Sequence, residues 1–513
     1  MVGLIFNNSI AKNIFNIVRQ GKNTALTEEE FYTLELQRWL ISPERMMQIK
    51  GHLYYEGEHD ILSRKREMIT GDGKTEEVKG VPNNHVIDNQ YAKLVNQKAN
   101  YLVGQPFVID CQNDTYVKLL KGIFDKQFMR TLKNTVKNSE NCGIAWLYPY
   151  YADDGKLSFR LFPGYEILPF WQDSEHTVLD SAVRYYLVEG YEGSNRVIIQ
   201  KVEIYDRKGV HRYTYDGGKL TPDVDNSEKS ADTSQIVMVG ADGKVIGYNW
   251  ERIPLVPIKF NEHEIPLIKK VKSLQDGINA ILSDFENNMQ EDKYNTIYVL
   301  KNYDGTDLGE FRKNLAVFGA VKVRCDGDMN GGVETLEINV NSDNYKAILE
   351  VFKKALIENG MGYDAKDDRL SGNPNQMNIQ SMYSDIDLDA NDMETELQAS
   401  FVDVLWFVNA YLANAGYGDF SNEEVNIIFN RDILINETEA IANCVASVGL
   451  LSTETIIKQH PWIDDPLKEL ELLEEEKKKQ QADMYDTSVF QNFREPGNEG
   501  KKGGVDDAED TEE

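Results

Sequence analysis

Apolar residues recur every three or four positions along two stretches in the middle of the chain, the spacing typical of amphipathic helices. The apolar positions of the first stretch are Leu267, Val271, Leu274, Ile278, Ile281, Phe285 and Met289. Polar residues occupy its opposite side: Lys269, Lys270, Lys272, Asp276, Asn279 and Glu286. The second stretch comprises Tyr345, Ile348, Leu349, Phe352 and Leu356, and it stops at Asn359 and Gly360, a typical helix C-terminus. Because strand and turn signals fill the interval, we predict an antiparallel helix pair with a small β tip.

A polar segment and a much longer helical pattern follow this pair. Residues 361–375 contain few apolar residues and many turn formers, so we expect them to form a loop. Helical spacing then returns at Ile379, Met382, Tyr383, Ile386, Met393, Leu397, Phe401, Val404, Leu405, Val408 and Leu412. At about 1.5 Å per residue such a helix is roughly 55 Å long, whereas helices of globular proteins average about a dozen residues. It is a structural strut or, alternatively, a long core helix of a large α/β protein.

The N-terminal part is predicted to be mainly helical. A capping box at 27–30 begins one helix, a second runs from Pro43 to Gly57, and a third from Asp88 to Leu102. The residues expected on the inward side of the third helix are Tyr91, Leu94, Val95, Lys98, Tyr101 and Leu102. The charged stretch from Arg64 to Pro82 is expected to be an exposed loop.

Residues 107–260 are predicted to be rich in β structure and to pack against the long helices. The expected strands, separated by Asp-Gly turns, are 144–150, 157–162, 182–188, 196–205, 210–215 and 235–239. One helix, from about Tyr116 to Ser139, interrupts them. The predicted fold class is therefore α+β.

The C-terminal part is expected to contain one strand and several helices. The strand is 425–430, and the helices are 441–451, a short one beginning near Ser452, and a highly charged one at 466–481. From Ala482 the chain is polar and acidic, and we expect this tail to be disordered.

Composition narrows the class of protein. The chain has 513 residues, 41% hydrophobic and 27% charged, enough for two or three globular domains. Its net charge of −30, taken alone, argues against a protein that grips DNA. Four scattered cysteines indicate neither a zinc site nor a disulfide scaffold. Neither Met1–Phe15 nor the apolar window Phe401–Ala415 fits a signal peptide or a membrane span, so a soluble intracellular protein is expected.

Three short motifs are candidate ligand sites. Gly73-Lys74-Thr75 resembles the end of a phosphate loop, but Met68 stands where that loop requires glycine. A calcium-loop pattern is complete at Asp326, Asp328, Asn330 and Glu337. Its flanks alternate like strands, so we predict a β-hairpin there and no metal, with calcium as the alternative. A second, incomplete match is predicted to be an acidic helix face: Asp385, Asp387, Asp389 and Glu396.

Enzyme signatures are weak throughout the sequence. The seven histidines are dispersed, and no Ser, His or Cys spacing matches a hydrolytic triad. A glycosidase-type pair of carboxylates stays open among so many acidic residues. We therefore expect neither an enzyme nor a cofactor.

Four segments, in order along the chain, resemble the portal proteins of tailed bacteriophages, of the type found in siphophages of Gram-positive hosts. They are 54–62 with its Tyr-Tyr-Glu-Gly sequence, 101–107, 298–305 and 401–418. The resemblance implies a portal fold that forms a ring, with long stem and wing helices, a β-rich wing, a small α/β clip and a helical crown.

The resemblance also implies a division of the chain. The expected parts are a wing at 1–266, stem helices at 267–292 and 342–359, a clip at 293–341, a tunnel loop at 360–377, a long wing helix at 378–424, a wing edge and crown at 425–481, and a disordered acidic tail at 482–513. The clip would contact terminase through Lys301, Asn302, Tyr303 and Asp304. The tunnel-loop residues expected to face the DNA channel are Lys366, Arg369, Asn373 and Asn375.

The implied function is a homododecameric ring at a capsid vertex of the virion, assembled in the host cytoplasm. Its channel would pass double-stranded DNA during packaging and genome ejection. The implied partners are the large or small terminase subunit, the major capsid and scaffolding proteins and a head-completion adaptor, with no membrane.

Physical reasoning fits this picture. Ring closure would bury apolar stripes that a lone helix pair exposes, and an acidic wall would keep the duplex from binding tightly. Lys366 and Arg369 would touch phosphates transiently, although the same cations could simply keep a flexible loop soluble. The alternatives are a calcium-binding protein or enzyme that uses residues 326–337, and another structural ring of the head vertex.

Overall fold

The computed structural model describes residues 27–69, 73–77, 81–223, 232–239, 245–291, 297–301, parts of 307–336, and 342–364, 376–431, 437–463 and 465–490. The chain divides into two compact units. The first comprises Met1–Asp367 and Ser381–Ile433, and the second comprises Asp368–Gln380 and Leu434–Glu513. Each unit is described separately below.

The N-terminal helices of the first unit begin and end where the capping residues predict. Helix α2 (Glu28–Leu40) has the complete capping box, in which the Glu30 amide donates to Thr27 Oγ1 at 3.2 Å. Helix α3 (Pro43–Glu56) starts with proline at its first position and ends at Gly57, whose φ is 92°. Helix α4 (Gln90–Val103) confirms the third prediction.

Two expectations in this region are wrong. The stretch Arg64–Pro82, expected to be a loop, contains an antiparallel hairpin of β1 (Glu67–Ile69) and β2 (Thr75–Glu77). The single helix expected at 116–139 is two helices, α5 (Asp114–Ile123) and α6 (Lys126–Cys142). The break occurs because the Asp125 carboxylate caps α6, accepting from the Phe128 amide at 2.9 Å.

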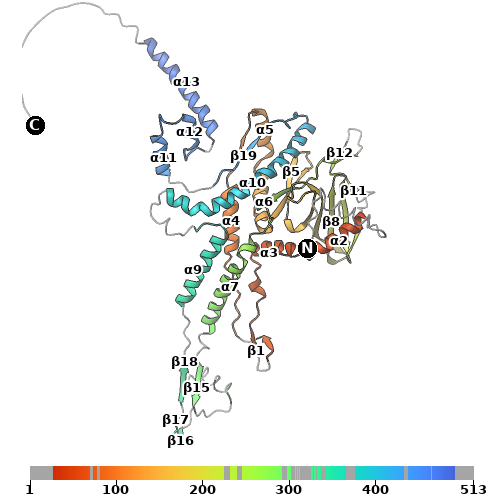
Figure 1. Cartoon of the computed structure of the whole chain (residues 1–513), viewed down its shortest axis with the longest axis vertical. Helices are drawn as coiled ribbons and strands as arrows, with labels where there is room; N and C mark the ends of the chain where they lie inside the picture. The colour runs from red at the N-terminus through yellow and green to blue at the C-terminus, as the bar shows by residue number, and fades with distance from the viewer. Residues whose placement is uncertain are drawn as a thin grey trace, which may run out of the picture. The chain divides into compact units, whose positions relative to one another are not determined.

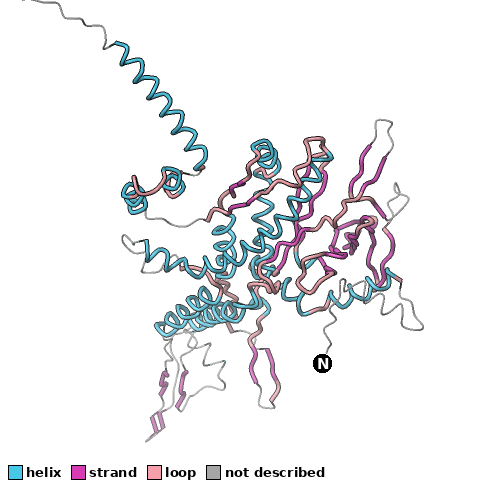
Figure 2. The backbone as a smooth tube through the Cα atoms, turned by 45° about the horizontal axis from the view of Figure 1, so that its top comes forward, coloured by secondary structure: helices cyan, strands magenta, loops and turns pink. Residues whose placement is uncertain are grey.

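The β-rich region forms two main antiparallel sheets (Figures 1 and 2). The smaller sheet has the order β14-β4-β5, with β4 at Ile144–Tyr151, β5 at Leu157–Phe162 and β14 at Val256–Lys259. The larger follows the order β10-β9-β8-β7-β6, with β6 at Ile167–Trp171, β7 at Leu179–Glu192, β8 at Asn195–Asp206, β9 at Gly209–Asp216 and β10 at Lys219–Pro222. Short strands complete the region: β3 (Val108–Asp110) with β19 (Asn426–Ile428), β11 (Asp232–Thr233), and β12 (Ile236–Val239) with β13 (Val245–Tyr248). The single-turn helices are η1 (Asp60–Ser63) and η2 (Gly164–Glu166).

Two apolar clusters hold these sheets together. In one, the rings of Trp146 and Trp171 stack with centroids 5.6 Å apart. In the other, Phe31 and Leu36 of α2 pack against Val183 and Val202 of the larger sheet. Burial of large apolar side chains on both sides of the sheets therefore fixes α2 against the β-rich region.

The three long helices have the predicted positions. Helix α7 spans Ile268–Glu291, α9 spans Ser342–Asn359 and α10 spans Gln376–Asn414. Figure 1 shows α7 and α9 side by side, leading toward the strands of the β tip. The apolar stripe of α10 is buried as expected, at Met382, Ile386, Met393, Leu397, Phe401, Val404, Val408 and Leu412.

A line of polar side chains is the most deeply buried part of α7 beyond its first turns. These residues, spaced four apart, are Gln275, Asn279, Ser283 and Asn287. The sequence pattern placed Asn279 on the side opposite the apolar stripe, and its exposed fraction there is 0%. A remote segment of the chain covers this face.

The covering segment is the extended chain from Asn84 to Tyr91. Its backbone N–H groups donate to the polar line of α7: Asn84 to Asn287 at 2.7 Å, Val86 to Ser283 at 2.9 Å, Asp88 to Asn279 at 3.1 Å and Tyr91 to Gln275 at 2.9 Å. Every second residue of an extended chain advances about 6.6 Å, close to the roughly 6 Å between every fourth residue of a helix. The two periods match over the first two steps, from Asn84 to Asp88. The third step spans three residues, to Tyr91 in the first turn of α4, and we call the whole set of contacts the polar ladder.

A buried histidine extends the polar ladder. The side-chain Nδ2 of Asn279 lies 2.7 Å from His59 Nδ1, and His59 Nε2 lies 3.0 Å from the Tyr54 carbonyl oxygen. Burial lowers the pKa of His59, which favours the neutral ring. A neutral ring that accepts at Nδ1 and donates at Nε2 satisfies both contacts.

The second unit contains three described helices. They are α11 (Glu437–Ala446), α12 (Thr453–Lys458) and α13 (Pro466–Phe490). Helix α13 continues past Ala482, so the expected start of a disordered tail at that residue is wrong. Residues 491–513 lie outside the described residues. Among the helices that the structure describes, none combines the length and apolar character that crossing a bilayer requires.

The polar ladder makes a specific prediction about stability. Replacing Ser283 by alanine leaves the Val86 amide buried without its acceptor, so the free energy of unfolding should fall by about 1–3 kcal/mol. The matched control is the replacement of the exposed Ser273 of the same helix by alanine, which should change the free energy of unfolding little. Urea denaturation followed by circular dichroism measures both variants. Equal stability of the two would contradict the structural importance of the ladder.

Candidate channel elements

The helix pair α7–α9 is held by close aromatic and backbone contacts. The ring centroids of Phe285 and Tyr345 lie 5.1 Å apart, and the side-chain Nδ2 of Asn288 donates to the Tyr345 hydroxyl at 2.9 Å. Gly277 faces Phe352, and a side chain on Gly277 would place its Cβ 2.6 Å from that ring. The glycine therefore allows the two helices to approach closely.

The other side of α9 carries apolar residues that the described chain leaves uncovered. Ile348 is 48% exposed and Val351 65% exposed, and Met289 near the end of α7 is 59% exposed. Of the apolar residues predicted for α9, only Leu356 is fully buried. This face is consequently available for contact with another molecule.

The tip of the pair is a β structure, as predicted. Strand β15 (Ile297–Lys301) pairs with β18 (Gly332–Leu336), so that Lys301 lies opposite Gly332. Among the expected terminase-contact residues, Lys301 ends β15, whereas Asn302, Tyr303 and Asp304 lie outside the described residues.

The calcium-loop pattern folds as strands. Strands β16 (Cys325–Asp326) and β17 (Met329–Asn330) pair so that Asp326 faces Met329, and β18 follows directly. Asp328 and Glu337 lie outside the described residues. A calcium loop of this type binds one ion between two helices. Here the second half of the pattern is the strand β18 and not a helix. Within the described ranges, no three His, Cys, Asp or Glu residues are grouped so that they could hold a metal ion.

The expected tunnel-loop residues Lys366, Arg369, Asn373 and Asn375 lie outside the described residues, but the segment that leads into the loop is described. This exit segment, Gly360–Asp364, lies against α4. An added Cβ would lie 2.2 Å from Leu94 Cδ2 at Gly360 and 2.4 Å from Leu94 Cδ1 at Gly362. The two glycines therefore permit the close approach.

A buried lysine anchors the exit segment. The Lys98 ammonium donates to the Met361 carbonyl at 3.0 Å and pairs with the Asp389 carboxylate of α10 at 2.6 Å. Lys98 is 4% exposed, and burial lowers its pKa while Asp389 opposes that shift. Asp387 and Asp389, predicted to be part of an exposed acidic face, thus make specific contacts, since Asp387 accepts from the Tyr101 hydroxyl at 3.0 Å.

A buried carboxyl group lies near this lysine. Glu140 of α6 is 0% exposed, and neither carboxyl oxygen has a hydrogen-bond partner among the described residues. Burial raises the pKa of Glu140 well above its ordinary value, and the Lys98 charge opposes this only in part. Burial therefore favours the neutral form of Glu140, and the carboxylate that pairs with Lys98 is Asp389.

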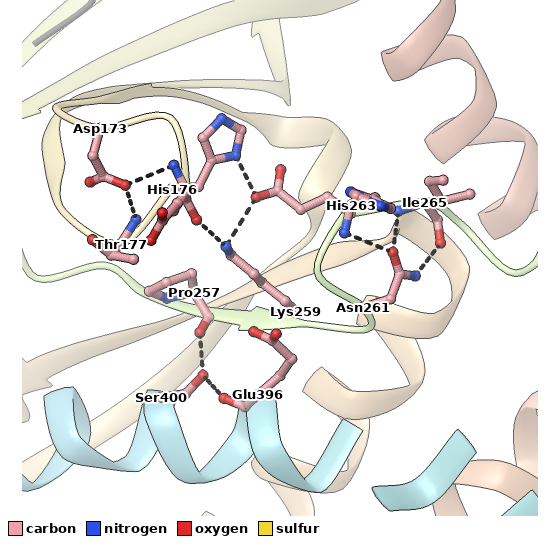
Figure 3. Close-up of polar contacts among 12 residues, drawn as sticks. Asp173, His176, Thr177, Pro257, Lys259, Asn261, His263, Ile265, Glu396 and Ser400 are labelled. Carbon is pink, nitrogen blue, oxygen red and sulfur yellow. Dashed lines mark hydrogen bonds and ion pairs between the residues drawn. The ribbon is translucent and has the colours of Figure 1, made fainter. Parts of the chain in front are cut away.

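A second polar cluster precedes α7 (Figure 3). His176 and Glu264 both have left-handed backbones, with φ of 58° and 54°, and His176 Nδ1 lies 2.7 Å from Glu264 Oε1. The Lys259 ammonium lies 3.5 Å from the same carboxylate, and the His176 ring stacks on Trp171 at 5.0 Å. A Cβ at Gly143 would lie 2.0 Å from the Glu264 carbonyl oxygen, so the chain entering α7 is fixed from two sides.

Comparison with known proteins shows which family the chain resembles. The family model described as phage portal protein, SPP1 Gp6-like, matches residues 48–483. The portal protein of Bacillus phage SPP1 is 30% identical over 85% of this chain and 84% of its own length. The portal protein of Clostridium phage phiCD119 is 27% identical over 90% of this chain and 100% of its own. A chain from a solved neck of a native GTA particle, computed with C12 symmetry, covers 71% of this chain and 88% of its own at 11% identity and a TM-score of 0.36.

A match over residues 48–483, supported by two relatives matched over 84% and 100% of their lengths, assigns the chain to a structural class of virion component. The chain belongs to the phage portal protein family, SPP1 Gp6-like. The resemblance identified in the sequence is therefore confirmed.

Sequence reasoning missed the residues that position these elements. The i, i+4 repeat of Gln275, Asn279, Ser283 and Asn287 was a visible signal for a buried polar face. The pattern of the third helix did place Lys98 on the inward side, and the structure confirms that it is buried, but its partners were not predicted. Glu140 gave no such signal, because it sits within an ordinary amphipathic helix.

The neutral state of Glu140 predicts a pH-dependent difference in stability. A folded-state pKa raised above the ordinary 4.5 favours folding at low pH, and this contribution is lost as pH rises through the raised pKa. The variant Glu140→Gln should therefore gain stability relative to the wild type as pH rises from about 4.5 toward neutrality. Denaturation at a series of pH values measures the difference. The exposed Glu44→Gln is the control, and parallel profiles for all three proteins would show that Glu140 is ionised in the folded state.

Proposed function

We propose that the chain forms a homododecameric ring at one capsid vertex, whose channel passes double-stranded DNA during packaging and genome ejection. Membership of the portal family carries the proposal. The uncovered apolar residues Ile348 and Val351 of α9 support it, because a neighbouring copy in a ring would bury them.

In this proposal α7 and α9 are the stem, residues 293–341 form the clip, 360–377 the tunnel loop, and 378–424 the long wing helix. The wing comprises 1–266, and the wing edge and crown comprise 425–481. The net charge of −30 suits a conduit, since each phosphate neutralised by the wall would add affinity and hold back the moving duplex.

The proposed partners attach at different parts of the ring. Terminase and then a head-completion adaptor would dock on the clip, where Lys301, Asn302, Tyr303 and Asp304 are the proposed contacts. Major capsid and scaffolding proteins would contact the ring during assembly in the host cytoplasm. The ring would act without an enzymatic activity of its own, because terminase supplies the energy for DNA movement.

Ring formation is the direct test. Size-exclusion chromatography with light scattering and negative-stain microscopy should show rings of the wild-type chain with a central hole wide enough for a duplex. The substitution Val351→Asp should prevent ring formation, because it places a charge in the proposed apolar contact. The matched variant Lys346→Asp, at an exposed polar position of α9, should still form rings. A wild-type chain that stays monomeric at all concentrations would contradict the proposal.

The tunnel-loop cations make a separate prediction. If Lys366 and Arg369 touch phosphates, Lys366→Glu with Arg369→Glu should reduce packaged DNA and its retention, because repulsion replaces two weak attractions. Nuclease-resistant DNA per particle measures packaging. Unchanged packaging and retention would mean that these residues only keep the loop soluble.

A further inference from the structure

Helix α4 contacts the chain on both sides of residues 365–375, the central part of the proposed tunnel loop, here called the loop. Before the loop, the exit segment Gly360–Asp364 packs on Leu94, and Gln97 Nε2 donates to the Tyr363 carbonyl at 3.1 Å. After the loop, the Tyr101 hydroxyl donates to Asp387 of α10 at 3.0 Å. These contacts come from one face of α4, because positions 94, 97 and 101 are spaced by three and four residues.

Lys98 lies on the same face and joins the two sides directly. Its ammonium donates to the Met361 carbonyl before the loop and pairs with Asp389 after it, at 3.0 and 2.6 Å. An ammonium group has three donors and no acceptor, so two fixed oxygens hold it in one place. A single buried charge therefore ties together two segments that are separated in sequence by the loop.

The exit segment needs such a tie because its backbone is strained. Met361 has a φ of 54°, the left-handed region that residues other than glycine rarely adopt. The amides of Gly360, Met361 and Gly362 still donate to carbonyls of α9, at 3.0, 3.1 and 2.9 Å. The bond from Lys98 to the Met361 carbonyl stabilises the segment in this conformation.

We infer that Lys98 is a positioning residue for DNA passage: it fixes the direction in which the chain leaves α9 for the loop, by holding the Met361 carbonyl and Asp389 at once. This inference rests on the proposed function, because positioning matters only if the loop meets DNA. Neither carboxyl oxygen of nearby Glu140 makes a hydrogen bond to the ammonium, so the tie depends on the single pair with Asp389.

A simpler role for Lys98 is charge balance, in which the ammonium only neutralises buried Asp389. The two roles predict different behaviour when both partners are replaced. Hydrophobic residues of similar volume often replace a buried ion pair without loss of stability. Such hydrophobic residues cannot donate a hydrogen bond to the Met361 carbonyl, so the exit segment would still lose the contact that positions it.

The experiment compares four proteins: the wild type, Lys98→Met, the double variant Lys98→Met with Asp389→Leu, and the control Lys121→Met at an exposed site of α5. Negative-stain microscopy first shows which of them form rings. Hydrogen exchange by mass spectrometry then follows the amides of residues 360–364. Nuclease-resistant DNA per particle gives packaging for the same proteins.

We expect rings from the double variant, with exchange in 360–364 faster than in the wild type by about tenfold or more, since a hydrogen bond to a charged group is lost. Packaged DNA should fall in the same variant, while Lys121→Met matches the wild type. The double variant avoids an unpaired Asp389, so it remains informative if Lys98→Met alone does not fold.

Two results would overturn the inference. If amide exchange in 360–364 and packaged DNA were the same in the double variant as in the wild type, Lys98 would only balance charge. Faster exchange with unchanged packaging would show that the direction of the exit segment does not affect DNA passage. A wild-type ring that packages no DNA would contradict the proposed function itself, and the wild-type measurement shows this before any variant is compared.

Discussion

The polar ladder between α7 and residues 84–91 is the constraint on which the stem depends. A helix that is covered on one side by extended chain and on another by α9 must satisfy every buried donor and acceptor. Gln275, Asn279, Ser283 and Asn287 do so by giving acceptors to backbone N–H groups that have no strand partner. Because these bonds are directional, they fix the rotation of α7 about its axis as well as its position. The apolar side of the helix is thereby turned toward α9.

Both ends of the helix pair are fixed by similar means. The chain enters α7 through left-handed Glu264 and leaves α9 through left-handed Met361. Each such residue costs on the order of 1–3 kcal/mol, so surrounding contacts must hold it. A cationic side chain of the body supplies one of those contacts at each end, Lys259 beside Glu264 and Lys98 at Met361. The helix pair α7–α9 is therefore joined to the rest of the first unit by fixed contacts at both of its ends.

The sequence predicted most of the helices because caps and periodicity are local signals. The capping box at Thr27 and the glycine after Asn359 marked boundaries that the structure confirms. The break at Asp125 was missed, since a continuous apolar stripe masked a capping residue. The hairpin after Arg64 was missed because its strands are only three residues each.

The candidate site was harder to predict for a different reason. Whether Asn279 is buried depends on chain segments that are distant in sequence, and a polar residue on a helix gives the same local pattern in either case. The inward position of Lys98 could be predicted from its helix, but its partners Met361 and Asp389 could not. The family resemblance predicts where the loop and the clip lie, but Lys98 of α4 and Asp389 of α10, whose ion pair lies at the exit segment, belong to no motif. Tertiary contacts, rather than local propensity, determine this part of the protein.

The central claim is that the ladder-fixed stem presents the uncovered face of α9 to a neighbouring copy around a channel. An electron cryomicroscopy reconstruction of the purified assembly tests it most directly. The account predicts a closed ring in which residues 84–88 contact α7 of the same chain and Val351 lies buried against the adjacent subunit. A reconstruction in which Ile348 and Val351 face solvent, with no second copy in contact, would contradict it.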